Sequence, residues 1–441
     1  MPLLLPMLLA ACGTGPEPPT CAQGELLDGD SCVPEVCGTG TWGNLETDPD
    51  TVYVDASAEE EGDGSKDRPF TLVQDGLDAQ GRNGMVAVAA GTYVENPKLT
   101  SEHSGVHLAG RCRELVTVNG SAGSELDYEA GSGIYLDRSD FAGNWTLSDL
   151  TVTGAPWSGI LQFGGTLGLE RISSVDNGDA GVETYVGTLD LTDVTIRGSA
   201  RTGIYLYRSD VTFEGGEVLE TEGESLTGWA AGILAEEDST VHLSDVVIRR
   251  NAAGGIVLEG STATLQGVRV AESRADHGGF GGYGVFVDAG SVLEATDSVV
   301  ESSQQVGIHT AGGVVTLDGV QVLDTRADEQ GGLSAGLYAE DGGQFTLVDS
   351  LVEGSQMFGL YLTGASATLQ GVGVLDTRTG LDEQWGIGIA LAEGSVLEAT
   401  DSEVTDSRMV GLFAWESSVT LQSVEIGDTT PGSFGQYGSG V

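Results

Sequence analysis

The chain has 441 residues, including 69 glycines, 11 prolines and only 6% aromatic residues, a composition that disfavours helices and is typical of strands separated by turns. Its formal net charge is −49 at pH 7, from 18 Lys and Arg against 67 Asp and Glu. Such a surface repels nucleic acid and anionic lipid headgroups, which excludes both as electrostatic partners. The charge favours solubility in a salty or calcium-containing exterior, and binding of cations or of a cationic partner is the alternative.

The first twelve residues bear on the compartment. A short apolar run at residues 3–9 leads into LAAC at residues 9–12, which resembles the lipobox of bacterial lipoproteins. The resemblance implies that Cys12 is lipidated as the first residue of the mature protein, and that Gly13, in place of Asp, directs it to the outer membrane or cell surface. The run is too short to span a bilayer and lacks the basic residues that usually precede such a signal. Either translation starts upstream of Met1 or the likeness is fortuitous.

Four further cysteines indicate disulfides in an exported chain: Cys21, Cys32, Cys37 and Cys112. Four cysteines allow three connectivities. The segment CAQGELLDGDSC forms a small loop if Cys21 pairs with Cys32, which leaves Cys37 to join Cys112 and fasten the N-terminal segment to the first coil. Free thiols or a zinc site are the alternatives, and no histidine lies near the first three cysteines.

Residues 13–50 are rich in Cys, Pro and Gly and have no periodicity, which indicates a tether. Residues 51–132 are expected to hold an N-terminal cap and the first coils. They begin with a strand, TVYVDAS, and an acidic turn, followed at residues 71–80 by a short helix with Leu72, Val73 and Leu77 on one face. The segment MVAVAAGTYVE then predicts two strands around a tight turn.

The sequences YVDAS, GDGSKDRPF and VAVAAGTYVE, with the short helix between them, resemble the N-terminal segment of exported right-handed parallel β-helix proteins of the pectate-lyase-like superfamily. The resemblance implies an all-β fold, a right-handed parallel β-helix or solenoid, whose open end is covered by the short capping helix. Without such a cover the first coil would expose its core and its unpaired strand edges.

Residues 133–441 repeat one motif: a glycine, an apolar residue, any residue and a second apolar residue. From Gly203 the steps alternate between 29 and 23 residues, so the unit is a 52-residue double coil. The motif glycines are Gly203, Gly232, Gly255, Gly284, Gly307, Gly336, Gly359, Gly388 and Gly411. A coil this short cannot hold a βαβ unit, which needs about 30 residues, but it fits three short strands. The last glycine of the series, Gly440, begins another coil as the chain stops, so we expect a C-terminal truncation or a partner that covers the end.

Acidic residues recur in columns. One column lies inside the second apolar stretch of alternate coils, with glycine at the same place in the coils between: Asp193, Asp245, Asp297, Asp349 and Asp401, alternating with Gly267, Gly319 and Gly371. Asp and Gly both tolerate left-handed backbone, so this column predicts a sharp bend, and a calcium site, which needs dense oxygen ligation, is the alternative. No other cofactor is predicted. A second column follows the third strand, where its carboxylates are expected to accept hydrogen bonds from turn amides: Glu220, Glu272, Asp324, Asp376 and Asp428.

Every second coil has six extra residues just before the motif glycine. Because these long loops recur every 52 residues, they are expected to form one ridge, and loops on a rigid solenoid are where function concentrates. Aromatic residues beside carboxylates are typical of sugar binding, whereas aromatics that fold back on their own loops are the structural alternative. The candidate ligand-binding residues are Trp229, Phe280, Tyr283, Trp385 and Tyr437.

Catalytic signatures are weak. The motifs of pectate lyases and polygalacturonases, the P-loop and HExxH do not occur. If hydrolysis or elimination took place, neighbouring long loops would bring together a set of charged residues at about 10 Å spacing, two coil rises: Arg274, Asp276, His277, Arg326 and Asp328.

The sequence leads to three hypotheses. The first is a lipid-anchored cell-envelope protein that binds polysaccharide or an envelope protein through the loop ridge. The second is a carbohydrate-active lyase or epimerase acting on uronic-acid polysaccharide. The third is a passive structural stalk. The sequence leans away from an enzyme but does not decide among them.

Overall fold

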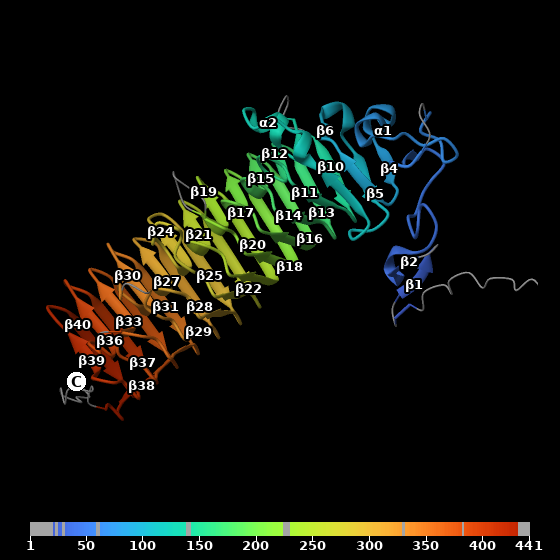
Figure 1. Ribbon diagram of the computed structural model, residues 1–441. Helices are drawn as coiled ribbons and strands as arrows, with labels where there is room; N and C mark the ends of the chain where they lie inside the picture. Colours follow the sequence, from blue (N-terminus) through green and yellow to red (C-terminus); the bar gives the residue numbers. More distant parts are fainter. Residues whose placement is uncertain are drawn as a thin grey trace, which may run out of the picture.

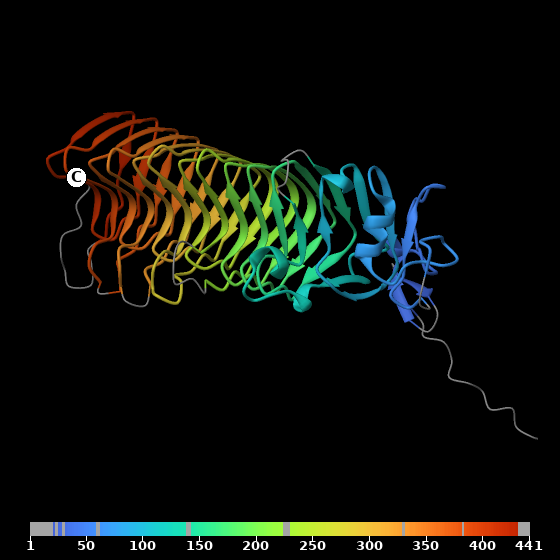
Figure 2. The same cartoon turned by 90° about the horizontal axis from the view of Figure 1, so that it is seen from above.

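The computed structural model describes residues 21–22, 25–28, 31–58, 62–137, 143–223, 230–328, 331–381 and 383–430. The residues Cys12, Gly13, Trp229, Tyr437 and Gly440, which were named above, lie outside these ranges. The molecule is a long stack of coils that runs from the N-terminal helix α1 to the last strands before the C-terminus (Figure 1). Seen from above, the coils stack side by side, and loops project along one long edge (Figure 2). The right-handed parallel β-helix expected from the sequence is confirmed.

Each coil contributes one strand to a 13-stranded sheet, and neighbouring strands in this sheet run parallel. Every motif glycine from Gly203 to Gly411 lies in one of these strands. The strands are β6 (Lys98–Leu99), β9 (Ile134–Leu136), β12 (Ile160–Phe163), β15 (Ala180–Tyr185), β17 (Thr202–Tyr207), β19 (Ala231–Glu236), β21 (Gly254–Glu259), β24 (Tyr283–Asp288), β27 (Val306–Ala311), β30 (Ala335–Glu340), β33 (Phe358–Thr363), β36 (Ile387–Ala392) and β39 (Val410–Ala414).

The other strands of the coils form a 26-stranded parallel sheet that folds around the rest of the core. Its strands are β3 (Val52–Val54), β4 (Gly84–Val88), β5 (Gly91–Val94), β7 (Val106–Gly110), β8 (Val116–Asn119), β10 (Asn144–Ser148), β11 (Thr151–Thr153), β13 (Thr166–Glu170), β14 (Ser173–Val175), β16 (Thr188–Arg197), β18 (Asp210–Leu219), β20 (Thr240–Arg249), β22 (Thr262–Gln266), β23 (Arg269–Ala271), β25 (Val292–Thr296), β26 (Val299–Glu301), β28 (Val314–Asp318), β29 (Gln321–Leu323), β31 (Gln344–Val348), β32 (Leu351–Glu353), β34 (Ser366–Gln370), β35 (Gly373–Leu375), β37 (Val396–Thr400), β38 (Glu403–Thr405), β40 (Ser418–Gln422) and β41 (Glu425–Ile426).

The predicted bend is confirmed in the backbone. The five aspartates of the first column have φ between 44° and 54°, and the three glycines that alternate with them have φ between 63° and 66°. These are left-handed values, which a short polar side chain or glycine adopts most readily. In most coils the bend separates a five-residue strand from a three-residue strand, as between β22 and β23. In β16, β18 and β20 the strand continues through it for ten residues.

The second acidic column also has left-handed backbone, from Glu220 at φ 59° to Asp428 at φ 49°. Its side chains bond differently from our expectation. Asp324 and Asp376 accept hydrogen bonds from the guanidinium of Arg378, at 3.1 and 2.7 Å, and Glu220 pairs with Arg250 at 2.8 Å. The turn amides that we expected as donors were therefore the wrong partners for these three carboxylates. The reason is that each exposed side chain reaches an arginine instead: Asp376 reaches one of its own coil, Glu220 one of the next coil, and Asp324 one that lies two coils further on.

A column of motif glycines marks the corner where each coil enters the 13-stranded sheet. A Cβ built on Gly307 would lie 2.5 Å from the carbonyl oxygen of Gly336 and 2.5 Å from Cγ1 of Val322. The same approach, at 2.5 to 2.8 Å from the next glycine carbonyl, recurs at each motif glycine from Gly203 to Gly388. Because these glycines do not have positive φ, lack of space rather than backbone conformation requires them.

The interior is one apolar cluster that extends from Val54 in β3 to Leu412 in β39. In most strands of the 13-stranded sheet the two inward motif positions are apolar; Ile204 and Leu206 of β17, for example, are fully buried. In β12, β15 and β27 the second inward position holds a buried polar residue: Gln162, Thr184 and Thr310. Burial of the apolar side chains stabilises the fold by about 1.5–3 kcal/mol each. The third motif residue, between them, therefore points outward.

The helix α1 (Val73–Gln80) covers the N-terminal end of the stack, as expected. Val73 and Leu77 are fully buried in the same core cluster. The carboxylate of Glu95 accepts hydrogen bonds from the backbone amides of Val73 (2.8 Å) and Gln74 (3.0 Å) and so caps the first turn. The other short helices are α2 (Tyr128–Gly131) and the 3₁₀ turns η1 (Glu35–Cys37), η2 (Ser101–His103) and η3 (Gly120–Ala122).

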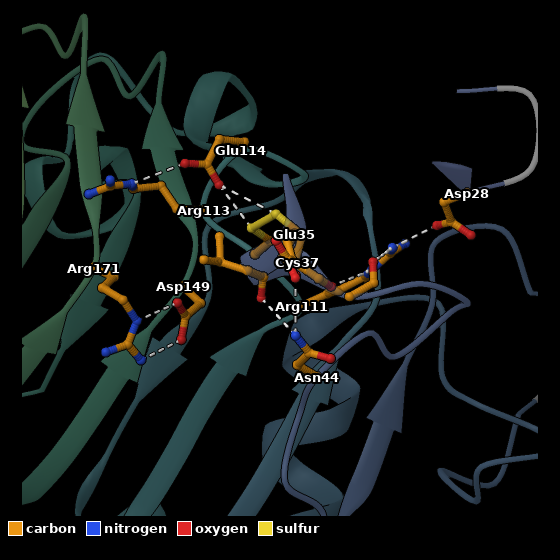
Figure 3. The surroundings of a disulfide bond; sticks show 12 residues. Asp28, Glu35, Cys37, Asn44, Arg111, Arg113, Glu114, Asp149 and Arg171 are labelled. Atoms are coloured by element: carbon orange, nitrogen blue, oxygen red, sulfur yellow. Dashed lines mark hydrogen bonds and ion pairs between the residues drawn. A yellow bond between two sulfur atoms is a disulfide. The ribbon is translucent and has the colours of Figure 1, made fainter. Parts of the chain in front are cut away.

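The N-terminal segment is fastened to the first coils. It contains an antiparallel hairpin of β1 (Glu25–Asp28) and β2 (Ser31–Pro34), and both expected disulfides are present, Cys21–Cys32 and Cys37–Cys112. Beside the second disulfide, the buried guanidinium of Arg111 donates to the Cys37 and Gly38 carbonyls and to Asp28, the last at 2.6 Å (Figure 3). Among the described residues no helix is both long and apolar enough to cross a membrane.

The glycine column gives a test of this packing. Substitution Gly307→Ala should destabilise the protein by about 1–3 kcal/mol, because the added methyl overlaps a neighbouring backbone carbonyl that cannot move without breaking the stack. Gly168→Ala is the matched control, since a Cβ there meets nothing closer than 3.7 Å. Thermal unfolding followed by circular dichroism would show a lower Tm for Gly307→Ala alone, and equal Tm values for the two variants would contradict the packing argument.

Candidate functional site

The outward face of the 13-stranded sheet carries side chains in three parallel columns. In β33, for example, Phe358, Tyr361 and Thr363 point outward, while Leu360 and Leu362 enter the core. The parallel register places equivalent residues of successive coils directly beside one another. A residue type that recurs at one motif position therefore becomes a continuous row along the molecule.

Aromatic rings dominate this face in its C-terminal half. The middle column passes from Phe286 to His309, Tyr338 and Tyr361 by strand register, and rings from the preceding loops stack beside it. Successive ring centroids are 4.7–5.8 Å apart, which is the range of favourable aromatic pairs. We call this set the aromatic row: Tyr283, Phe286, His309, Tyr338, Phe358, Tyr361 and Trp385.

The aromatic row opens at its C-terminal end into a cavity of about 480 Å³, the aromatic pocket. The rings there are accessible: Trp385 is 46% exposed, Phe413 44% and Trp415 61%. Phe286 and His309, earlier in the row, are buried. The pocket is lined by Leu333, Met357, Phe358, Tyr361, Trp385, Ile387, Ala390, Leu391, Ala392, Phe413 and Trp415. A concave, mainly apolar surface of this size is typical of a ligand site.

Carboxylates border the aromatic row. The third outward column contains Glu236, Glu259, Asp288 and Glu340, each two residues after a middle-column position. Glu340 accepts a hydrogen bond from the Tyr338 hydroxyl at 2.5 Å and lies 3.1 Å from Nε2 of His309. Burial lowers the pKa of His309 although the Glu340 carboxylate opposes this effect. The imidazole is therefore neutral at pH 7 and contributes a ring, rather than a charge, to the row.

A second, acidic hollow of about 410 Å³ lies further toward the N-terminus on the same side, lined by Tyr207, Glu236, Glu237, Asp238, Glu259, Gly260 and Asp288. Arg208 lies near it, and its guanidinium pairs with Glu237 at 3.2 Å and lies over the Tyr207 ring at 5.2 Å. The charge of this hollow is strongly negative because one arginine faces five carboxylates.

Glu183 is a buried carboxyl on the same face. It accepts hydrogen bonds from the hydroxyls of Ser158 and Tyr185. Burial raises its pKa above the ordinary value of 4.5, against the lowering effect of these two bonds. Nearby, Arg201 forms a two-pronged ion pair with Asp179, the shorter contact being 2.6 Å. The arginine is thus already neutralised by another carboxylate.

Two of the candidate ligand-binding residues belong to the aromatic row. Tyr283 and Trp385 join the aromatic row: Tyr283 lies 5.5 Å from Phe286 between ring centroids, and Trp385 lies 5.8 Å from Phe358. Phe280 is 75% exposed at the tip of its loop. Trp229 and Tyr437 lie outside the described residues.

The candidate catalytic residues lie in two loops, and their carboxylates shape those loops. Asp276 accepts from the backbone amides of Gly278 (2.8 Å) and Phe280 (2.9 Å). Asp328 accepts from the Gly332 amide (3.0 Å) and the Gln305 side chain (2.9 Å). These bonds are those of loop-closing turns.

Arg274 donates to the Thr221 carbonyl at 3.2 Å, whereas His277 and Arg326 are exposed. Catalysis by these residues remains a prediction.

Sequence reasoning missed the outward sheet face. The signal was present in the third motif position, read as any residue: GVFV, GIHT, GLYA, GLYL and GLFA supply Phe286, His309, Tyr338, Tyr361 and Phe413. An aromatic residue at a solvent-facing position in so many coils favours a binding surface. The loops were the predicted binding surface because the glycine and the two apolar residues of the motif already accounted for the repeat.

Within the described part of the chain, one group of side chains has metal-ligand proximity: Cys37, Cys112 and Glu114. Both sulfurs belong to a disulfide, so they offer no thiolates to a metal. Glu114 Oε2 lies 2.8 Å from Cys112 Sγ, and its other oxygen is 3.6 Å from Arg113 Nε (Figure 3). Calcium binding elsewhere on the acidic surface remains a prediction.

Comparison with known proteins supports the fold. The family described as the right handed beta helix region matches residues 231–426. An N-terminal fragment of gene product 12 of bacteriophage Phi29 is similar at 11% identity, with a TM-score of 0.52 over 83% of this chain and 70% of that one. Tailspike protein 3 of bacteriophage CBA120 is similar at 12% identity and a TM-score of 0.50, over 84% of this chain and 59% of that one.

The chain thus spans about three fifths of the tailspike protein. Pectate lyase Pel9A gives 11% identity and a TM-score of 0.31, over 87% of this chain and 81% of that one. No curated protein sequence matches the chain. The two phage proteins share the β-helical fold with this chain.

The buried Glu183 predicts a pH dependence. Since the pKa of Glu183 is raised on folding, its protonated form stabilises the protein below pH 4.5, and this contribution is lost as the pH rises through the raised pKa. Glu183→Gln, a neutral isostere, should therefore match the Tm of the wild type at pH 4 and have a higher Tm than the wild type at pH 8. Glu294→Gln, at an exposed strand position, serves as control. A Tm difference for Glu183→Gln that does not change with pH would refute the prediction.

Proposed function

We propose that this chain is an exported β-helix protein, related to the pectate-lyase-like proteins it resembles, that binds polysaccharide along the outward face of its 13-stranded sheet. The observation that carries the proposal is the aromatic row ending in the open aromatic pocket. Sugar rings have apolar faces of C–H groups that stack on aromatic side chains, while their hydroxyls bond to polar groups at the rim. The row supplies the rings, and carboxylates border it.

The direction of the row fits a polymer. Successive coils are about 4.8 Å apart, and the row follows the long axis of the molecule from β24 through β27 and β30 to β33. Its first rings, Phe286 and His309, are buried. An extended glycan chain lying parallel to this axis would therefore meet the exposed rings at the C-terminal end, which are Trp385, Phe413 and Trp415. This surface replaces the loop ridge as the proposed contact, and loop residues such as Trp385 take part through their packing on the sheet.

A lyase or epimerase acting on uronic-acid polymers is less well supported. Such an enzyme must hold the carboxylates of its substrate with cations. The arginines beside the sheet face are already engaged: Arg201 with Asp179 at 2.6 Å and Arg208 with Glu237 at 3.2 Å. We therefore propose binding rather than cleavage. An envelope protein as ligand, or a passive stalk, are outcomes that the experiment below distinguishes.

Loss of the exposed rings should weaken the binding of polysaccharide. Trp385→Ala and Trp415→Ala should each weaken the affinity for a glycan selected on an array by about tenfold or more, because each removes a large central contact. Phe280→Ala is the matched control, since Phe280 is more exposed than either tryptophan but lies outside the pocket. Titration calorimetry would measure the change. Equal binding by all variants would contradict the proposal, and no glycan bound by the wild type would favour the envelope protein or stalk.

We further propose that the protein is anchored to the outer membrane by lipid on Cys12, on the strength of the residues LAAC and of Gly13. In a bacterial host, Cys12→Ser should move the protein from the membrane to the soluble fraction and abolish incorporation of labelled palmitate. Gly13→Asp should keep the label but retain the protein in the inner membrane. Wild-type protein without label would refute the anchor.

A further inference from the structure

The turns that follow the strands of the 13-stranded sheet carry a line of acidic residues, which starts after β30 and reaches one rim of the aromatic pocket after β36 and β39. Asp341 follows β30, Glu393 follows β36 and Glu416 lies two residues after β39. All three are exposed and have left-handed backbone, with φ of 54°, 56° and 49°. The residues just before Glu393 and Glu416, which are Ala392 and Trp415, line the pocket itself. We call these three residues the rim carboxylates.

The cations of this sheet face lie away from the pocket. Lys98 is over the Tyr135 ring at 5.0 Å and pairs with Asp137 at 3.4 Å. Arg201 and Arg208 likewise lie over tyrosine rings, at 5.4 and 5.2 Å, and pair with carboxylates. All belong to the N-terminal half of the sheet, so they do not balance the rim carboxylates.

The loops on the opposite side of the pocket carry cations beside carboxylates. Arg378, in the loop that leads to Trp385, is held by Asp376 at 2.7 Å and Asp324 at 3.1 Å. Arg408 lies next to Gly386, where an added Cβ would be 2.9 Å from Arg408 Cβ, and Asp406 precedes it by two residues. A ligand in the pocket therefore meets charges of both signs on this side and carboxylates alone on the other.

This asymmetry bears on the ligand's charge. Two like charges 4 Å apart repel by about 1 kcal/mol even in bulk water and by more near a protein surface, and like-charge contacts suppress wrong partners. From this asymmetry of charge we infer that the polysaccharide is uncharged and that the rim carboxylates exclude uronic-acid and other acidic polymers. The inference rests on the proposed function, since it specifies the ligand class of the same pocket.

The test removes the charges of the three rim carboxylates and compares the effect on polysaccharide binding with the effect of removing three charges elsewhere. The variant Asp341→Asn/Glu393→Gln/Glu416→Gln removes three charges at the rim. The control Asp297→Asn/Asp349→Asn/Asp401→Asn removes three charges at left-handed bends in the 26-stranded sheet, so net charge and backbone type match. Binding of each protein to a neutral β-glucan and to polygalacturonate of matched length is measured at 0.15 M salt, with EDTA and with calcium. Equal Tm values establish that the variants are folded.

We expect all three proteins to bind the neutral glucan and the rim variant alone to gain affinity for polygalacturonate, by about tenfold or more. Polygalacturonate binding by the wild type as strong as its glucan binding, with or without calcium, would overturn the inference. An equal gain in rim and control variants would also overturn it, because net charge would then account for the exclusion. If the wild type binds neither polymer nor any array glycan, the proposed function itself fails.

Discussion

The close contact between each motif glycine and the carbonyl of the next determines how the coils of this protein can stack. At this corner a Cβ would lie 2.5 to 2.8 Å from the neighbouring carbonyl oxygen, so the chain can turn into the 13-stranded sheet here only without a side chain. The corner is also filled by a β-branched residue near the end of each coil's third strand segment, such as Val322 against Gly307 or Ile248 against Gly232. One glycine in each coil thereby keeps the strands of every coil in a single register, since a shifted coil would bring a side chain into the corner.

Because of this register, the residues at one outward position of the repeat form a continuous surface along the molecule. Each outward residue of a coil lies beside its equivalents in the coils before and after it, so aromatic residues at the third motif position become the aromatic row. The bends and the turns become acidic columns in the same way. Rigid spacing also pre-organises the rings, which lowers the ordering entropy that binding costs. The proposed site is thus a consequence of repetition, and the accessible pocket arises at its C-terminal end, where Phe413 and Trp415 are exposed.

The charge of −49 is tolerated because most carboxylates stand in outward columns, in water, where screening is strong. The exceptions are informative. Glu183 is buried with a raised pKa, and the buried Arg111 holds the N-terminal segment through two backbone carbonyls and Asp28. Few cations remain along the sheet face, and those present are paired. Carboxylates therefore outnumber cations around the aromatic pocket, and the inferred charge of the ligand follows from this excess.

The sequence by itself determined the coil fold, the capping helix and the bend at the Asp193 column, because each depends on local spacing or on backbone preference. It left the disulfide connectivity open, since Cys37 and Cys112 are 75 residues apart and only the folded chain brings them together. It also provided the aromatic residues of the row, but it could not rank them. Whether Tyr338, Phe358 and Trp385 form a surface depends on which strand face points outward and on how the loops fold against it, and these follow from packing between residues of different coils. The bonds of Asp276 are local, from amides two and four residues further on, whereas the contact between Asp324 and Arg378, 54 residues apart in sequence, depended on three-dimensional proximity. Only the tertiary structure moved the candidate site from the loop ridge to the sheet face, since hydrophobic contacts with the sheet draw the loop aromatics onto it.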